Sequence, residues 1–199
     1  MEKIIFLDRD GTINREVNYL HRPEDLVFLP GVAEAMSMLK DAGFKLVVIT
    51  NQAGVARGYY TCEDVEKLHH FMNGQLIPLG AGVDAFYYCP HHPVHGIGIY
   101  KRDCRCRKPG IGMFEMAEQD FEIDKAHSYM IGDKLIDVEA GVTYGVAGIL
   151  VGTGYGASER QKVTDEKEMP LYDFYAETLM DAARYIIERD AADDERGCN

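Results

Sequence analysis

Positive charge is scarce in this sequence. Its 199 residues include 21 lysines and arginines against 33 aspartates and glutamates, which gives a net charge of −12. Affinity for nucleic acids rests largely on clustered lysine and arginine, so this balance argues against a general nucleic-acid-binding surface. Any phosphate-bearing ligand must instead be bound by a few local cations.

Long apolar runs are missing as well. No segment approaches the roughly 20 apolar residues that a membrane span requires. Residues 1–7 lead directly into a short apolar run, without the longer apolar stretch and small-residue cleavage site of a secretory signal. We therefore expect a cytoplasmic protein that has no membrane partner.

Internal repeats are absent, and no linker-like stretch interrupts the chain before about residue 157. A chain of this length suits one hydrophobic core. We expect a single domain over residues 1–199, monomeric, with an acidic tail that is frayed from about residue 190.

Apolar runs of strand length alternate with helical patterns along the chain. The pattern predicts strands at residues 3–7, 45–49, 85–88, 128–131 and 147–151. It predicts helices at residues 31–43, 61–79, 112–121 and 135–144. After residue 158 we expect one more helix, whose buried side carries Phe174, Leu179, Ala182, Ile186 and Ile187. This alternation indicates an α/β three-layer sandwich with a central parallel sheet.

Residues that could take part in catalysis follow the predicted strands, where ligands bind in such open sheets. Asp8 and Asp10 follow the first strand, Thr50 ends the second, and Asp133 follows the fourth, with Asp137 beyond it. Lys108 opens the helix that we expect at about residue 110. Two carboxylates with one residue between them, such as Asp8 and Asp10, repel each other. A fold keeps them together chiefly when a cation or a catalytic task requires it. Each residue alone is a weak signal, but together they indicate a phosphate site.

This order of acidic pair, hydroxyl, lysine and second acidic group resembles the haloacid-dehalogenase-like (HAD-like) phosphohydrolases, over about residues 4–154. The resemblance implies that Asp8 attacks phosphorus to form an aspartyl phosphate. Asp10 would protonate the leaving alkoxide, with a pKa raised by the neighbouring carboxylate, and later deprotonate the attacking water.

A catalytic Mg²⁺ fits this chemistry, because a carboxylate nucleophile needs a cation as it approaches an anionic phosphoryl group. We expect Asp8, Asp133 and the backbone carbonyl of Asp10 to bind the ion. The Thr50 hydroxyl and the Lys108 ammonium would hold the remaining phosphoryl oxygens.

The five cysteines of the sequence would stay reduced in the cytoplasm, so clustered cysteines favour a metal site over disulfides. Cys89 and His91, followed by Cys104 and Cys106, provide a tetrahedral ligand set for structural zinc. His92 or His95 could replace His91 as the nitrogen ligand, and a cluster of reduced cysteines without metal is the alternative. Zinc here would clamp the loop that precedes Arg107 and Lys108.

The segments DRDGTIN, TNQAGVARGYY, CPHHP with CRCRKP, and IGDKLID resemble the D-glycero-D-manno-heptose 1,7-bisphosphate 7-phosphatases, and less closely the histidinol phosphatases. The substrate would be a small sugar bisphosphate of nucleotide-activated heptose and lipopolysaccharide biosynthesis, of undetermined anomer. In that family Arg107 recognises the substrate, and the segments 16–19 and 50–53 with Lys134 line the sugar phosphate. The matching residues here are Glu16, Tyr19, Asn51, Gln52, Arg107 and Lys134.

A second phosphate requires further cations, and Arg57, Arg107 and Lys134 are available near the strand ends. Arg57 could equally be a solvent-facing charge. No connection is long enough for a separate cap domain, so the site should be open, framed by residues 14–30 and by the zinc loop.

Other functions share part of this pattern. A histidinol-phosphate phosphatase or a nucleic-acid end-trimming phosphatase would use the same chemistry, although the latter should show a basic groove. A phosphoacceptor signalling domain has no use for Asp10 or for a zinc loop. A catalytically silent zinc-binding interaction module is the remaining alternative.

Overall fold

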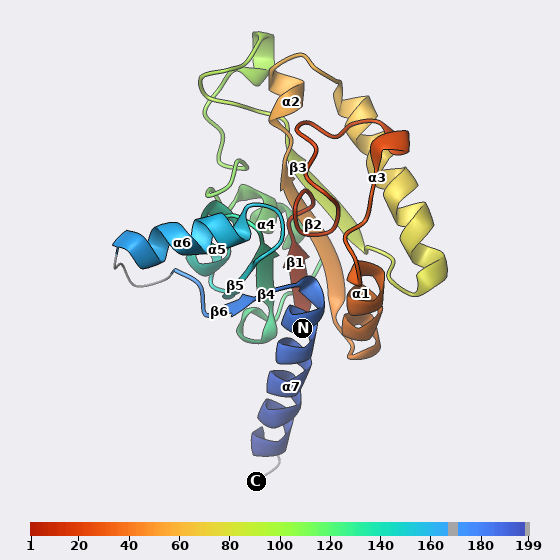
Figure 1. Ribbon diagram of the computed structural model, residues 1–199, viewed down its shortest axis with the longest axis vertical. Coiled ribbons are helices and arrows are strands. Elements are labelled where there is room, and N and C mark those ends of the chain that lie inside the picture. Colours follow the sequence, from red (N-terminus) through yellow and green to blue (C-terminus); the bar gives the residue numbers. More distant parts are fainter. Residues whose placement is uncertain (167–170, 198–199) are drawn as a thin grey trace.

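The computed structural model describes residues 1–166 and 171–197 of the chain (Figure 1). Six parallel strands form one sheet in the order β3-β2-β1-β4-β5-β6. Their bounds are β1 Ile4–Leu7, β2 Lys45–Asn51, β3 Ala85–Cys89, β4 Tyr129–Gly132, β5 Ala147–Val151 and β6 Phe174–Ala176. The predicted sandwich around a parallel sheet is confirmed.

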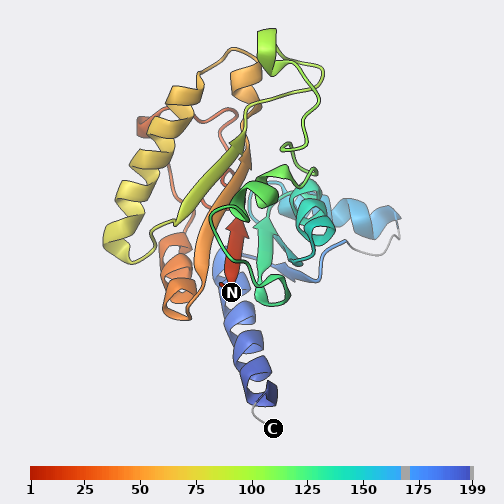
Figure 2. The ribbon, with the colours of Figure 1, turned by 180° about the vertical axis from the view of Figure 1, so that it is seen from behind.

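Helices cover both faces of this sheet (Figures 1 and 2). Their bounds are α1 Val32–Asp41, α2 Ala53–Ala56, α3 Cys62–Leu76, α4 Gly112–Ala117, α5 Leu135–Tyr144, α6 Gly156–Glu166 and α7 Leu179–Gly197. Short 3₁₀ helices lie at Pro23–Asp25, Ile77–Leu79, Gly98–Tyr100 and Lys125–His127.

The central strand β1 is buried on both faces, as its continuous apolar sequence predicts. Ile5 and Leu7 belong to the core cluster that contains buried residues of α1, α3 and α7. Ile4 and Phe6 belong to the opposite cluster, with buried residues of α4 and α5. Because successive side chains of a strand alternate between faces, this one strand supports both layers of the core.

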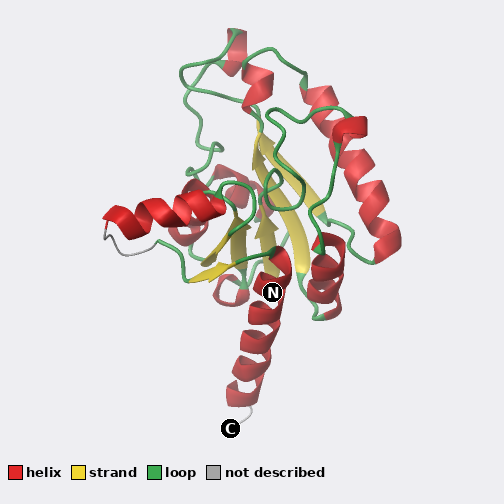
Figure 3. Ribbon diagram, viewed as in Figure 1, coloured by secondary structure: helices red, strands yellow, loops and turns green. Residues whose placement is uncertain are grey.

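The C-terminal part of the chain differs from the single helix that the sequence suggested. It contains α6, the short strand β6 and then α7 (Figure 3). Phe174, expected on the helix, lies in β6 and pairs with Ile149. The helical face of α7 was predicted better, since Leu179, Ala182 and Ile186 are buried. Of the tail expected to fray, the described part is helical through Gly197, and residues 198–199 lie outside the described residues.

All six strands run in the same direction, so their carboxyl ends lie along one edge of the sheet. Helix α2 and the long loop after β3 lie beyond this edge (Figure 2). The strand-end residues singled out in the sequence are thereby brought to one side of the molecule. Within residues 1–166 and 171–197, no helix combines the length and apolar character needed to cross a membrane.

Candidate active site

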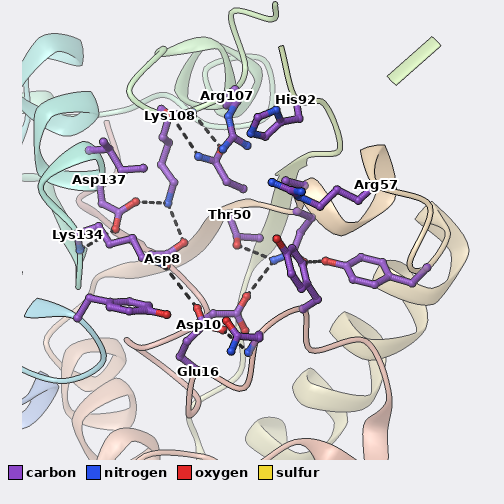
Figure 4. Close-up of a pocket in the computed structure, with 18 residues that line it drawn as sticks. Asp8, Asp10, Glu16, Thr50, Arg57, His92, Arg107, Lys108, Lys134 and Asp137 are labelled. Carbon is purple, nitrogen blue, oxygen red and sulfur yellow. Dashed lines mark hydrogen bonds and ion pairs between the residues drawn. The ribbon is translucent and has the colours of Figure 1, made fainter. Parts of the chain in front are cut away.

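Asp8 directly follows β1 and lies within a buried charge cluster (Figure 4). The Lys108 ammonium lies 2.7 Å from Asp8 Oδ1 and 2.7 Å from Asp137 Oδ1. It also donates a hydrogen bond of 2.8 Å to the carbonyl of Ile49. Burial alone would lower the pKa of Lys108, but the two carboxylates outweigh it and raise the pKa. The lysine is therefore charged and fixed beside Asp8.

Asp133, the first residue after β4, completes an acidic cluster with Asp8 and Asp137. One oxygen from each of the three carboxylates lies within 4.8 Å of the others. Asp133 Oδ2 accepts a hydrogen bond from the backbone N–H of Tyr155 at 2.9 Å, whereas the buried Oδ1 has no hydrogen-bond partner within the described chain. Burial and the nearby Asp8 carboxylate raise the pKa of Asp133 to about 8. This set of oxygen donors fits a hard divalent cation.

Two glycines leave room for the Asp133 side chain. Gly11 has φ +86° and Gly154 has φ +55°, a backbone region that favours glycine. A Cβ atom at either position would lie 2.2 Å from Asp133 Oδ2. The first acidic loop and the loop after β5 can therefore enclose Asp133 only because both positions lack a side chain.

Asp10 is surrounded by hydrogen-bond donors. Its carboxylate accepts from Arg9 Nη2 at 2.8 Å, from Asn14 Nδ2 at 2.9 Å and from Gln52 Nε2 at 3.1 Å. Burial favours the neutral acid, but Arg9 and the two amides outweigh it and lower the pKa of Asp10. The prediction of a raised pKa for Asp10 is thus wrong for the resting site, because Asp10 pairs with the Arg9 guanidinium.

The end of β2 positions both Lys108 and Asp10. Asn51 Oδ1 accepts from the backbone N–H of Lys108 at 3.0 Å, and Asn51 Nδ2 donates to its carbonyl at 3.1 Å. Gln52 Nε2 donates to Thr50 Oγ1 at 2.9 Å in addition to Asp10. These amides connect the loop of the lysine and the loop of the acid to one rigid strand.

A pocket of about 340 Å³ opens above these groups. Every residue that the sequence analysis placed in catalysis or substrate binding lines it, namely Asp8, Asp10, Glu16, Tyr19, Thr50, Asn51, Gln52, Arg57, Arg107, Lys108 and Lys134. Residues 16–19 and the loop after β3 both contribute to its wall, as expected for a site framed by these segments.

The pocket has two differently charged ends (Figure 4). Lys108 lies among carboxylates at one end, while Arg57, His92 and Arg107 contribute to the wall at the other. Arg57 thus faces the pocket, with its guanidinium carbon 5.8 Å from the centre of the Tyr19 ring. Lys134 Nζ lies 3.6 Å from Glu16 Oε2. This arrangement suits an elongated anion that carries charge at both ends.

The cysteines and one histidine of the long loop form a second cluster. One ligand atom each from Cys89, His91, Cys104 and Cys106 lies within 4.8 Å of the others. The Sγ atoms of Cys89 and Cys106 are 3.2 Å apart, and each lies 3.7 Å from His91 Nδ1. Such spacing is close to that of tetrahedral zinc ligands, whose bonds of about 2.0–2.3 Å separate the ligand atoms by roughly 3.5–3.8 Å.

His92, which the sequence left open as a zinc ligand, lies outside this cluster. Its Nδ1 accepts hydrogen bonds from the backbone N–H groups of Val94 at 3.1 Å and His95 at 2.8 Å. The ring lines the substrate pocket instead. His91 is therefore the histidine that the structure places with the cysteines.

Several residues of the site carried no role in the sequence analysis. Tyr60, Ile136 and Tyr155 line the pocket, but isolated residues of these types give no sequence signal. Asp137 was visible as the end of the second acidic motif, without a predicted partner. Arg9, between the two acidic residues of the first motif, is fully buried. The sequence alone would predict an exposed side chain there, because arginine is seldom fully buried.

Comparisons with known proteins agree with this geometry. The family model described as polynucleotide kinase 3 phosphatase matches residues 3–141, and the HAD-hydrolase-like model matches residues 105–182. A D-glycero-beta-D-manno-heptose-1,7-bisphosphate 7-phosphatase of Haemophilus ducreyi is 42% identical over 187 residues, which are 93% of this chain and 98% of the relative. A D-glycero-alpha-D-manno-heptose-1,7-bisphosphate 7-phosphatase of Burkholderia mallei is 45% identical over 149 residues, 75% of this chain and 79% of the relative.

Among solved structures, the D,D-heptose 1,7-bisphosphate phosphatase from B. bronchiseptica complexed with magnesium and phosphate superposes with a TM-score of 0.81 at 32% identity. The match covers 94% of this chain and 99% of that chain. The chain therefore belongs to the HAD-like phosphatases and, within them, to the D-glycero-D-manno-heptose-1,7-bisphosphate 7-phosphatase family.

Proposed function

We propose that this protein hydrolyses the 7-phosphate of D-glycero-D-manno-heptose 1,7-bisphosphate in the synthesis of nucleotide-activated heptose. The observation that carries this proposal is the match to the Haemophilus ducreyi phosphatase, which extends over 98% of that relative. The pocket supports it, because it combines a carboxylate beside a buried lysine with a separate cationic end. We further propose a single monomeric domain in the cytoplasm, where the clustered thiols would stay reduced.

Mg²⁺ is the cation that we propose for the acidic cluster, with Asp8, Asp133 and the backbone carbonyl of Asp10 as protein ligands. The unpartnered oxygen and raised pKa of Asp133 support a bound cation there. The magnesium and phosphate of the B. bronchiseptica relative agree with this choice. When bound, Mg²⁺ offsets negative charge on the phosphoryl group and on the two carboxylates.

The first half of the proposed reaction transfers the phosphoryl group to Asp8. A carboxylate oxygen of Asp8 bonds to phosphorus while the bond from phosphorus to the sugar oxygen breaks. Lys108 and Thr50 hold the other phosphoryl oxygens, and Asp10 donates a proton to the leaving sugar oxygen. Asp10 is ionised in the resting site, so this step needs the substrate's negative charge to raise its pKa.

The second half releases phosphate. Asp10, now ionised again, takes a proton from a water molecule that attacks phosphorus, and the bond to the Asp8 oxygen breaks. The phosphate at C1 would meanwhile lie against Arg57 and Arg107, with the sugar between the two ends. Lys134, expected with these two arginines, lies instead at the end with the carboxylates, beside Glu16 (Figure 4). Glu16, Tyr19, Asn51 and Gln52 would line the sugar.

Structural zinc is our proposal for the cluster of Cys89, His91, Cys104 and Cys106. It would fasten the long loop to the end of β3. The Arg107 side chain donates a hydrogen bond to the carbonyl of His91 at 3.3 Å. This bond connects a residue proposed to bind zinc with a residue proposed to bind the substrate. Zinc would thus support the cationic end of the pocket without taking part in the reaction.

A substrate panel tests this function. We expect kcat/KM for heptose 1,7-bisphosphate in Mg²⁺ to exceed that for histidinol phosphate and for a 3′-phosphorylated oligonucleotide, the latter included because of the family-model match. Both anomers of the bisphosphate are compared. Asp8→Asn should abolish turnover of every substrate while the thermal unfolding temperature is retained. A preference for histidinol phosphate or the oligonucleotide would overturn the assignment, and equal activity of Asp8→Asn would overturn the mechanism.

A further inference from the structure

Arg9 is a buried link between the acidic motif and helix α3. Its side chain is 0% exposed although it is charged. Nη2 donates to Asp10 Oδ2 at 2.8 Å and Nε donates to Asp10 Oδ1 at 3.2 Å, so the guanidinium holds both oxygens of the carboxylate. Nη2 also contacts the carbonyl of Leu20 at 3.1 Å and Gln52 Oε1 at 3.2 Å. Such a fork fixes the plane of a carboxylate as well as its position.

The remaining arm of the fork points to His69. Arg9 Nη1 lies 3.2 Å from His69 Nε2. A guanidinium has donors only, so His69 Nε2 must be the acceptor, and the neutral ring then carries its proton on Nδ1. Burial and the Arg9 charge lower the pKa of His69 to about 3, in agreement with a neutral ring.

The His69 ring is itself fixed by the layer around it. It is 5% exposed on the inner side of α3 and stacks on Phe86 of β3, with ring centres 4.6 Å apart. Tyr88 contacts it edge-on at 5.9 Å. A single rotamer therefore presents Nε2 to Arg9, and the contact joins α3 and β3 to the site.

We propose that His69 is a positioning residue for the acid–base carboxylate: it accepts a hydrogen bond from Arg9, and Arg9 in turn orients Asp10 toward the leaving oxygen. This inference rests on the proposed function of Asp10. Without the acceptor, Arg9 Nη1 would lose a buried partner and the fork could rotate, and Asp10 would lose its fixed direction.

Substitution of His69 tests the proposal. His69→Leu removes the acceptor, whereas His69→Gln can return an amide oxygen near the Nε2 position. His70→Leu is the matched control, because His70 is the next residue of α3 and is exposed. Each variant is assayed for kcat/KM, which reports the steps through departure of the leaving group, on the sugar bisphosphate and on p-nitrophenyl phosphate.

The two substrates separate positioning from general damage. The sugar alkoxide needs a proton to leave, whereas p-nitrophenolate leaves without one. We expect His69→Leu to lower kcat/KM for the sugar phosphate by roughly tenfold, part of the 10²–10⁴ that an acid can supply, with a much smaller loss for the aryl ester. His69→Gln should recover most of the loss, and His70→Leu should match wild type.

If His69→Leu loses kcat/KM equally on both substrates, or loses none, the proposal is overturned. The proposed function still stands in that case, because the wild-type enzyme is active. Absence of wild-type activity toward any phosphate ester would instead refute the proposed function. Should His69→Leu fail to fold, ¹⁵N NMR of the wild-type histidines decides. A neutral His69 protonated on Nδ1 is expected, and a proton on Nε2 would overturn the proposal.

Discussion

Single residues decide how close the two acidic loops can approach. Asp133 is enclosed by Gly11 and Gly154, and one of its oxygens lies within 4.8 Å of oxygens of Asp8 and Asp137. A misplacement of about 1 Å in a site of this kind can cost on the order of 100-fold in rate. Gly11, in the DRDGTIN segment, is therefore needed for the position of an aspartate that is distant in sequence.

Substitution of Gly11 tests this dependence. Gly11→Ala would bring a Cβ into collision with Asp133, so we expect a loss of activity on the order of 100-fold and a higher Mg²⁺ requirement. Gly43→Ala is the control, because Gly43 has φ +88° but nothing within 4 Å of the added Cβ. It should cost about 1–2 kcal/mol in unfolding free energy with the Mg²⁺ dependence unchanged. Mg²⁺ titrations of activity that are alike in the two variants would contradict the steric explanation.

At the scale of single residues, the sequence indicated which residues form the site, but it did not indicate which side chains contact them. Asp8, Lys108 and Asp133 could be predicted because each follows a strand or precedes a helix in a recognisable order. The lowered pKa of Asp10 could not, because it depends on the direction of the Arg9 side chain. His69 lay beyond prediction for the same reason: its contact joins residues 60 positions apart.

Elements with a strong apolar pattern were predicted well. The fifth strand and the helix before it have the predicted bounds, and the other strands differ by one or two residues at their ends. Strand β6 was missed because it has only three residues, Phe174–Ala176. Its aromatic residues fit a helical pattern equally well when the chain is read alone. Pairing with β5 decides its structure, and that pairing is a tertiary effect.

The loop between β3 and α4 contains one short 3₁₀ helix and carries His92, Arg107 and Lys108. A segment of this length with little regular structure needs other contacts to hold it. The cluster of cysteines and His91 lies at both ends of the loop. We therefore attribute the position of Arg107 largely to the proposed zinc.

Removal of a zinc ligand tests this role. In Cys106→Ala we expect zinc to be lost and KM for the sugar bisphosphate to rise roughly tenfold, since a lost hydrogen bond to a charged group costs about 1.5 kcal/mol. The change in kcat should be smaller. Cys62→Ala is the control, because Cys62 lies on α3 outside the cluster. Native protein without zinc by metal analysis, or equal KM in the two variants, would contradict the proposal.

On the scale of the whole molecule, the charge distribution explains how an acidic protein can bind a substrate that carries two phosphates. The net charge is −12, yet Arg57, Arg107, Lys108 and Lys134 all line one pocket. Parallel strands bring these cations together with the carboxylates, because their carboxyl ends share one edge of the sheet. The long-range field of the protein favours a small ligand that the pocket can enclose over an extended polyanion.

The central claim is that the Asp8 carboxylate forms a bond to phosphorus. Mass spectrometry of acid-quenched Asp10→Asn protein, mixed with p-nitrophenyl phosphate and Mg²⁺, tests it most directly, because p-nitrophenolate leaves without an acid while loss of the base should slow hydrolysis of the intermediate. We predict a protein heavier by one phosphoryl group, mapped to Asp8 and absent from the Asp8→Asn variant. Release of one equivalent of p-nitrophenol while Asp8 stays unmodified would contradict the account.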